Sequence, residues 1–176
     1  MESNEARQTA VDIFTAALQA VDPGKLVLSH CESISSACSR NQCRKLFVAS
    51  FGKAAFAMTR ALVESPVSDL ITRGIVLTKY GHAPGVLPDR INVFEAGHPV
   101  PDEAGVSATG RVIDMLKNGD PQTLIMCLIS GGASALLVAP CHGVTLSDKQ
   151  QVTQLLLRAG ADIRELNTVR KHLSRI

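Results

Sequence analysis

The sequence TLIMCLISGGAS occupies residues 123–134 and joins the most hydrophobic run of the chain, Thr123–Ile129, to a glycine-containing segment, Ser130–Ser134. A short apolar run that ends at a turn signal is typical of a strand buried on both faces, as in a parallel sheet. We therefore expect residues 123–129 to form the central strand of a sheet, and residues 130–134 to form the turn that follows it.

Three runs upstream have the composition of short buried strands, at residues 45–50, 74–78 and 91–95. A stretch of good helix formers follows the first at residues 54–63, and apolar residues at helical spacing follow the third at residues 106–116. Because strands that alternate with helices build parallel sheets covered on both sides, the sequence predicts an α/β fold, a three-layer α/β/α domain. Ligands of such sheets bind beyond the carboxyl ends of the strands.

Helical patterns also mark both ends of the chain. Apolar positions over residues 10–21 fall on one helix face, and a polar stretch then leads to residue 45. Near the other end, Ser147 with Gln150 predicts a capping box, and so does Asp162 with Glu165. The last helical pattern continues to the end of the chain, so we expect this chain to be part of something longer.

Composition excludes several classes of protein. Of the 176 residues, 18 are Lys or Arg and 16 are Asp or Glu, which gives a net charge of +2, and aromatic residues make up only 3%. A protein that binds nucleic acid usually has an excess of basic residues and aromatic side chains on which bases stack, and these values indicate neither. No apolar run approaches the roughly 20 residues of a membrane span, and the polar N-terminus is unlike a targeting peptide. We expect a cytoplasmic protein with no nucleic-acid or membrane partner. Whether the chain forms a homo-oligomer stays open.

The five cysteines have no paired spacing of the kind that zinc or redox sites use, so we expect reduced, structural thiols and no metal ligands.

Two turns at strand ends are candidate anion sites. In residues 130–134 the glycines let backbone N–H groups approach an anion closely, and Ser130 and Ser134 add hydroxyl donors. The alternative is a tight turn whose glycines serve geometry alone. Gly52-Lys53 follows the strand at residues 45–50, where a lysine can stabilise a carboxylate or a transferring phosphoryl group. A solvated lysine in an exposed turn is the alternative there.

A loop and a helix face supply further candidates. Two prolines fix the loop from Gly97 to Asp102, in which His98 or Asp102 could bind substrate or transfer a proton. Asp102 also fits the first turn of a helix. The polar face of the last helix carries Asn167, Arg170 and Lys171, which point either into a site or into water.

Several named motifs are absent. The chain has neither the P-loop pattern nor the G-x-G-x-x-G fingerprint of dinucleotide-binding domains. The nucleophile elbow of serine hydrolases is half present, because Leu136 stands where its second glycine belongs.

Four strings, taken in order, resemble the N-terminal part of the glycerate 2-kinase family. Members of this family carry a C-terminal MOFRL domain, and bacterial members were often labelled hydroxypyruvate reductase. The strings are Phe51–Ala55, Gly97–Gly105, Leu128–Leu137 and Glu165–Ser174, and the resemblance spans nearly the whole chain.

The resemblance implies a Rossmann-like domain with a mostly parallel sheet and ATP-dependent phosphorylation of D-glycerate to 2-phosphoglycerate, with Mg²⁺ as the metal. ATP and D-glycerate are the implied small-molecule partners. Lys53 matches the active-site lysine. The nucleotide-binding positions are Gly52, Ser130, Gly131, Gly132, Ala133 and Ser134, and the substrate-binding positions are His98, Asp102, Asn167, Arg170 and Lys171.

The chain departs from the family in two ways. Ala133 stands at the third glycine of the family's turn, where a methyl group would cost about 1 kcal/mol if the position needs positive φ. Residues 1–176 also match only the N-terminal domain, without the MOFRL domain, so we expect a chain that lacks half of the cleft and is inactive alone. The remaining alternatives are an NAD(P)H-dependent hydroxypyruvate reductase and a truncated, non-catalytic nucleotide-binding remnant.

Overall fold

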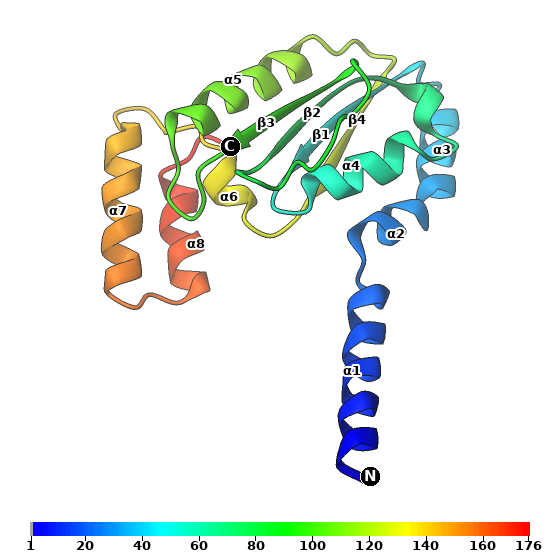
Figure 1. Cartoon of the computed structure of the whole chain (residues 1–176). Helices are drawn as coiled ribbons and strands as arrows, with labels where there is room; N and C mark the ends of the chain where they lie inside the picture. The colour runs from blue at the N-terminus through cyan, green and yellow to red at the C-terminus, as the bar shows by residue number, and fades with distance from the viewer. Residues whose placement is uncertain (1) are drawn as a thin grey trace.

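The computed structural model describes residues 2–176 and contains one four-stranded sheet (Figure 1). Its strands are β1 (Lys45–Phe51), β2 (Ile71–Lys79), β3 (Ile91–Ala96) and β4 (Thr123–Ile129). All neighbouring strands are parallel, in the order β3-β2-β1-β4. The four predicted strands are confirmed, and the parallel sheet has the order of the first strands of a Rossmann fold.

Helices cover both faces of this sheet and bury an apolar cluster on each. On one face Val48 and Val76 of the strands pack with Phe56 and Leu62. On the other face Leu77 packs in a second cluster with residues of the opposite helices. The helices of the first face are α2 (Pro23–Leu28), α3 (Cys31–Arg40) and α4 (Ala55–Val63), and those of the second are α5 (Glu103–Lys117) and α6 (Ala133–Leu136). The three-layer α/β/α prediction is therefore confirmed.

The helices α7 (Leu146–Arg158) and α8 (Ile163–His172) lie side by side as a hairpin next to the sheet (Figure 1). The capping box that starts α8, Asp162 with Glu165, is confirmed. The box predicted from Ser147 was wrong, because the N-cap of α7 is Thr145, which pairs with Asp148. The last helical pattern was also predicted too long: α8 ends at His172.

The strand β4 lies at an edge of the sheet, so its predicted central position was wrong. The chain leaves β3, passes back over β1 and β2, and adds β4 on the far side of β1. Among the described residues, β1 is the only strand that pairs with β4. Ile125 and Ile129 are consequently 44% and 65% exposed, although their strand has the composition of a buried one.

Before β1 the chain is more helical than predicted. The stretch between residues 22 and 45 forms α2 and α3 instead of an irregular connection, since Asp22 caps α2 and Val27 and Cys31 are buried against α4 and the sheet. The first helix, α1 (Glu2–Ala20), extends away from the sheet (Figure 1), and its apolar residues Ile13 and Phe14 are exposed. Within residues 2–176 we find no helix whose length and apolar character would let it cross a membrane.

Candidate functional site

The carboxyl ends of β1 and β4 form the point at which the order of the strands reverses. In open α/β sheets, ligands bind in the crevice at such a point. Gly52 and Lys53 follow β1, and the turn Ser130–Ser134 follows β4, which is the neighbour of β1. The two turns that the sequence singled out separately are therefore adjacent at this crevice.

The two turns are joined by hydrogen bonds. The Ser130 N–H donates to Phe51 O (3.0 Å), and the Lys53 N–H donates to Gly131 O (2.9 Å). The Ser130 hydroxyl oxygen accepts from the Ala54 N–H (3.0 Å). Gly52 has a φ of +120°, and a Cβ at this position would overlap the side chain and backbone of Ser130. The absence of a side chain at Gly52 therefore makes room for Ser130, and each turn fixes the other.

The start of α4 presents free N–H groups beside these turns. A helix leaves its first N–H groups without helical acceptors, and they carry the positive end of the helix dipole. The N–H of Ala54 donates to Ser130 and that of Ala55 to Gly52 O, whereas among the described residues we find no acceptor for the N–H groups of Phe56 and Ala57. The Lys53 side chain is exposed at the same end of the helix. This arrangement suits an anion.

The Lys53 and His98 side chains meet over Gly132. A Cβ built on Gly132 would lie 3.0 Å from His98 Nε2 and 3.4 Å from Lys53 Cγ, and Gly132 has a φ of +93°. Both observations require glycine there. Ala133, in contrast, is the first residue of α6 and has a helical conformation, so its methyl group causes no strain where the family has a third glycine.

Positive charge gathers around His98. Burial lowers the pKa of His98, and the neighbouring charges of Lys53, Lys79, Arg170 and His82 lower it further. The imidazole is therefore neutral at pH 7 in the free protein and would gain a proton more readily beside an anion. His82 also holds the β1–α4 turn, because its Nδ1 lies 3.2 Å from Lys53 O.

Asp102 holds the loop that carries His98. Its carboxylate accepts the N–H groups of Gly97 and Gly105 (2.9 Å each) and the Tyr80 hydroxyl (2.8 Å), and it is the N-cap of α5. Burial by itself would raise the pKa of Asp102, but these hydrogen bonds outweigh it and hold the pKa below the ordinary value. With these bonds in place, its geometry favours a loop-holding role over contact with a substrate.

The polar face of α8 borders a second part of the site. The guanidinium of Arg170 donates to Pro99 O (2.9 Å), which ties α8 to the His98 loop. A cavity of about 360 Å³ separates α8 from α6 and from the end of β1. Its lining residues include Ala133, Ser134, Asn167, Arg170 and Lys171. The structure thus brings the candidates on α8 next to the turn after β4, and Arg170 faces both the cavity and His98.

Among the described residues, the side chains of this edge do not gather into a cage for magnesium. Mg²⁺ prefers oxygen ligands in octahedral geometry. Within residues 2–176 no three His, Cys, Asp or Glu side chains gather in a way that could hold a metal ion. The two carboxylates near the crevice, Glu95 and Asp102, both accept backbone N–H groups.

Three residues of this edge were not among the site residues predicted from the sequence, namely Lys79, Tyr80 and His82. They stand at and just after the end of β2, which continues one residue beyond the predicted strand. Strand ends of a parallel sheet share one edge, so the end of the strand at residues 71–79 was the signal that could have indicated them.

A family model described as "Domain of unknown function (DUF4147)" matches residues 9–176. The chain is 38% identical to a D-glycerate 2-kinase of Thermotoga maritima over 97% of its own length, and 36% identical to a glycerate 2-kinase of Pyrococcus horikoshii over 100%. Another relative, from Agrobacterium vitis, is 43% identical over 97% of the chain and carries a hydroxypyruvate reductase name.

Among solved structures, the chain is similar to the crystal structure of glycerate kinase from Thermotoga maritima, with a TM-score of 0.80 and 36% identity over 98% of the chain. The chain spans only about two fifths of these relatives, namely 37% to 40% of their own lengths.

Proposed function

Because the chain belongs to the DUF4147 family, the N-terminal domain of glycerate 2-kinases, we propose that it provides the ATP- and D-glycerate-binding half of a kinase that makes 2-phosphoglycerate. The observation that carries the proposal is the crevice between β1 and β4, where Lys53, His98 and the free N–H groups of α4 lie together. Phosphoryl transfer depends mainly on positioning and on stabilising negative charge, and these groups supply both.

In the proposed reaction, the C2 hydroxyl oxygen of D-glycerate bonds to the γ-phosphorus of ATP while the bond to the bridging oxygen of the β-phosphate breaks, and ADP leaves. The Lys53 ammonium stabilises the negative charge on the oxygens of the transferring group. The N–H groups of Phe56 and Ala57 bind phosphate oxygens, together with the backbone of residues 130–134.

The proton of the hydroxyl group passes to His98. Its lowered pKa keeps the ring neutral and able to accept a proton at pH 7. Asp102 is the weaker candidate for the base, because its carboxylate already accepts three hydrogen bonds. The sequence left these two residues open as alternatives, and the three hydrogen bonds of Asp102 favour His98 as the base.

The carboxylate of D-glycerate is proposed to bind on the α8 side of the crevice. Arg170 lies between the cavity and the His98 loop, and Asn167 and Lys171 line the same cavity. Burial lowers the pKa of the half-buried Arg170 below its ordinary value, and a guanidinium that has lost part of its hydration gains more from a carboxylate partner. The proposed substrate-binding positions are therefore His98, Asn167, Arg170 and Lys171, with Asp102 holding the loop.

Magnesium is part of the expected reaction, and within residues 2–176 no three His, Cys, Asp or Glu side chains gather into a cage for it.

The reductase alternative is disfavoured by the β1–α4 turn. A nicotinamide dinucleotide needs its pyrophosphate close to glycine backbone at the first such turn. The space beside Gly52 is filled by Ser130 instead.

The experiment that tests the proposal measures 2-phosphoglycerate from ATP and D-glycerate. It compares this chain with a fusion of the chain to the part of the Thermotoga maritima enzyme that follows the matched segment. We expect product from the fusion and little or none from the chain alone. Lys53→Ala in the fusion should lower kcat/KM about a hundredfold, the usual cost of losing one group that stabilises a transition-state charge.

The matched control is Lys117→Ala, which removes an exposed lysine at the far end of α5 and should leave kcat/KM unchanged. Turnover of hydroxypyruvate with NADH, without phosphorylation of D-glycerate, would instead establish the reductase. A folded fusion without either activity would favour the non-catalytic remnant.

A further inference from the structure

The C-terminal end of α3 brings two cysteines of the chain together. The Cys43 N–H donates to Cys38 O (2.9 Å), the Gln42 N–H donates to Ser39 O (3.1 Å), and Gln42 has a left-handed φ of +51°. Two such hydrogen bonds around a left-handed residue define a Schellman motif, in which the side chains at the positions of Cys38 and Cys43 commonly pack against each other. Two thiols therefore occupy the place of the usual apolar contact.

The backbone hydrogen bond also limits the distance between the two cysteines. It joins the carbonyl group of Cys38 to the N–H of Cys43, so standard bond lengths keep the two Cα atoms within about 6.8 Å even if the atoms lie in a straight line. Disulfides bridge Cα atoms that are about 4.4–6.8 Å apart. Cys31, the other cysteine of α3, stands two helical turns before Cys38, which places it about 10 Å away along the helix axis and beyond this range.

The two thiols differ in how easily a reagent reaches them. Cys43 is partly exposed, and its Sγ lies 3.7 Å from Asn41 O, so the thiol is turned back over the helix end. Cys38 is only 5% exposed, and its pKa is raised by burial and by the neighbouring Cys43. A thiol that stays protonated is a poor nucleophile, so a reagent from solution reacts first with Cys43.

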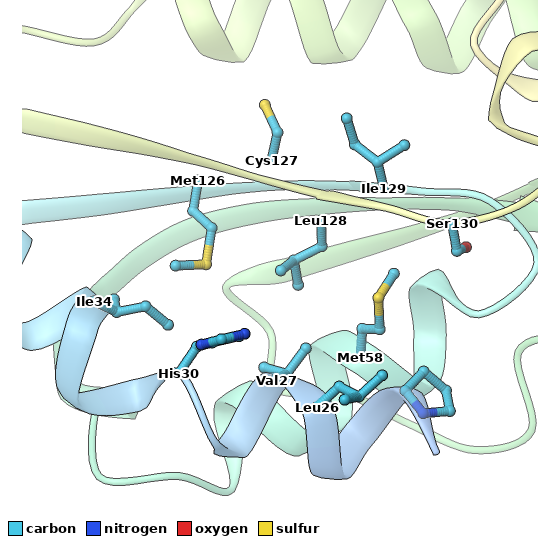
Figure 2. A pocket seen from close by; sticks show the side chains of 11 residues that line it. Leu26, Val27, His30, Ile34, Met58, Met126, Cys127, Leu128, Ile129 and Ser130 are labelled. Carbon is cyan, nitrogen blue, oxygen red and sulfur yellow. The ribbon is translucent and has the colours of Figure 1, made fainter. Parts of the chain in front are cut away.

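The segments on either side of this helix end are held in place. Ile34 of α3 packs against the core cluster, on the side of β4 that carries Met126 (Figure 2). After the helix end, the N–H groups of Arg44 and Lys45 both donate to Gln122 O (2.9 and 3.2 Å). Groups that fixed elements hold together react with each other at a higher effective concentration than the same groups on a flexible chain.

We propose that Cys38 and Cys43 are a reversible disulfide site, which forms by exchange with a small-molecule disulfide and locks the end of α3 to the start of β1. Their spacing of five positions lies outside the C-x-x-C pattern, so the sequence predicted only reduced, structural thiols. The Schellman turn compensates for the longer spacing, because it folds the chain back on the helix end. The site lies at the amino end of β1, opposite the crevice, and does not depend on the proposed kinase function.

The reaction consists of two thiol–disulfide exchanges. The Cys43 thiolate attacks one sulfur of the small disulfide, so that a mixed disulfide forms and one small thiolate leaves. The Cys38 thiolate then attacks the sulfur of Cys43, which forms the bond between the two cysteines and releases the second small thiolate. The two cysteines give up two electrons and two protons, and the small disulfide takes up both and becomes two thiols. An excess of the small thiol reverses both steps.

The test treats the reduced, folded chain with glutathione disulfide, blocks the remaining thiols by alkylation, and maps the product with trypsin and mass spectrometry. Trypsin cuts after Arg40 and Arg44, so Cys38 and Cys43 fall in separate peptides. We expect a disulfide between these two peptides and no glutathione left on Cys43. Fragmentation of the joined peptides distinguishes Cys38 from Cys31, because both lie in the peptide of residues 26–40.

The same reaction in concentrated urea separates the folded turn from mere closeness along the chain. At fixed concentrations of glutathione and its disulfide, the ratio of bridged to reduced chain should be at least about tenfold lower in urea, because the unfolded chain has no Schellman turn. Equal ratios with and without urea would overturn the proposal.

Two variants of α3 are matched to each other. Cys38→Ser should stop the reaction at the mixed disulfide and retain glutathione on Cys43, whereas Cys31→Ser, which removes the other buried cysteine of the helix, should leave the bridge unchanged. Loss of the bridge in Cys31→Ser, or glutathione retained on Cys43 of the unchanged chain, would overturn the proposal. The peptide map of the unchanged chain decides the question even where a variant does not fold. None of these measurements requires ATP or D-glycerate, so they stand apart from the kinase assay.

Discussion

Replacing Gly52 with alanine is expected to lower the free energy of unfolding by about 3 kcal/mol, because the β1–α4 turn and the turn after β4 occupy each other's space. Gly52 has a φ of +120°, a conformation that other residues rarely adopt. The new methyl group would also overlap the side chain and the carbonyl group of Ser130. The mutation therefore combines two independent costs.

The magnitude follows from these two effects. A non-glycine residue held in such a backbone conformation costs about 1–3 kcal/mol. An added methyl group in a filled site costs about the same, and here its neighbour is backbone, which moves less readily than a side chain. The two costs sum to between about 2 and 6 kcal/mol. Because the exposed part of the Ser130–Ser134 turn can shift to relieve the overlap, we expect a loss in the lower half of this range. A domain of ordinary stability would remain folded at 25 °C.

The measurement is urea unfolding followed by circular dichroism, with the same slope m for both proteins. Gly131→Ala is the matched control, since nothing lies within 4 Å of a Cβ at Gly131 and its φ is not positive. This control should change the stability by less than about 1 kcal/mol. Equal effects of Gly52→Ala and Gly131→Ala would refute the conclusion that Ser130 fills the space beside Gly52.

Four further predictions concern the loop, the helices and the anion site around the crevice. Asp102→Ala should lower the free energy of unfolding in urea by about 2 kcal/mol, because it removes the N-cap of α5 and leaves the Gly97 N–H without its acceptor. A decrease of less than about 0.5 kcal/mol would contradict the loop-holding role of Asp102. The pKa of His98 is lower in the folded protein than the ordinary 6.5, so the unfolded chain binds more protons between these two values. The free energy of unfolding should therefore rise as the pH increases from the lowered pKa to about 6.5. Unfolding measured at several pH values should show a smaller rise for the His98→Gln variant. Inorganic phosphate should raise the pKa of His98 in NMR titrations, and an unchanged pKa would argue against an anion site there. Thr145→Ala should cost about 1 kcal/mol by removing the capping box of α7, whereas Ser147→Ala should cost less than half of that.

Much of the fold could be predicted from short stretches of sequence. The four strands, the helices α1, α4, α5 and α8, and the capping box at Asp162 all depend on residues only a few positions apart. The helices α2 and α3 were missed because their stretch is polar and carries a weak apolar pattern. They are stabilised by a few buried residues, such as Val27 and Cys31, whose partners lie on α4 and the sheet.

The candidate site was predictable in its parts but not in its assembly. Gly52, Lys53 and the Ser130–Ser134 turn were visible as turns after strands. The roles of Asp102 and Tyr80 were not, since the bond between them joins residues 22 positions apart on different elements. The hydrogen bond that ties Arg170 to the His98 loop joins it to Pro99, 71 positions away.

The sequence by itself determined the alternation of strands and helices, and hence a parallel α/β sheet with its turns at one edge. Hydrophobic periodicity is a local property, so it fixes each element and the side that the element buries. Only the tertiary structure decided that β4 lies beside β1, at the edge of the described sheet. That order depends on contacts such as the Ala54–Ser130 hydrogen bond, 76 positions apart, which no local pattern encodes. The same contacts place Lys53 beside Ser130–Ser134 and leave the apolar edge of β4 open.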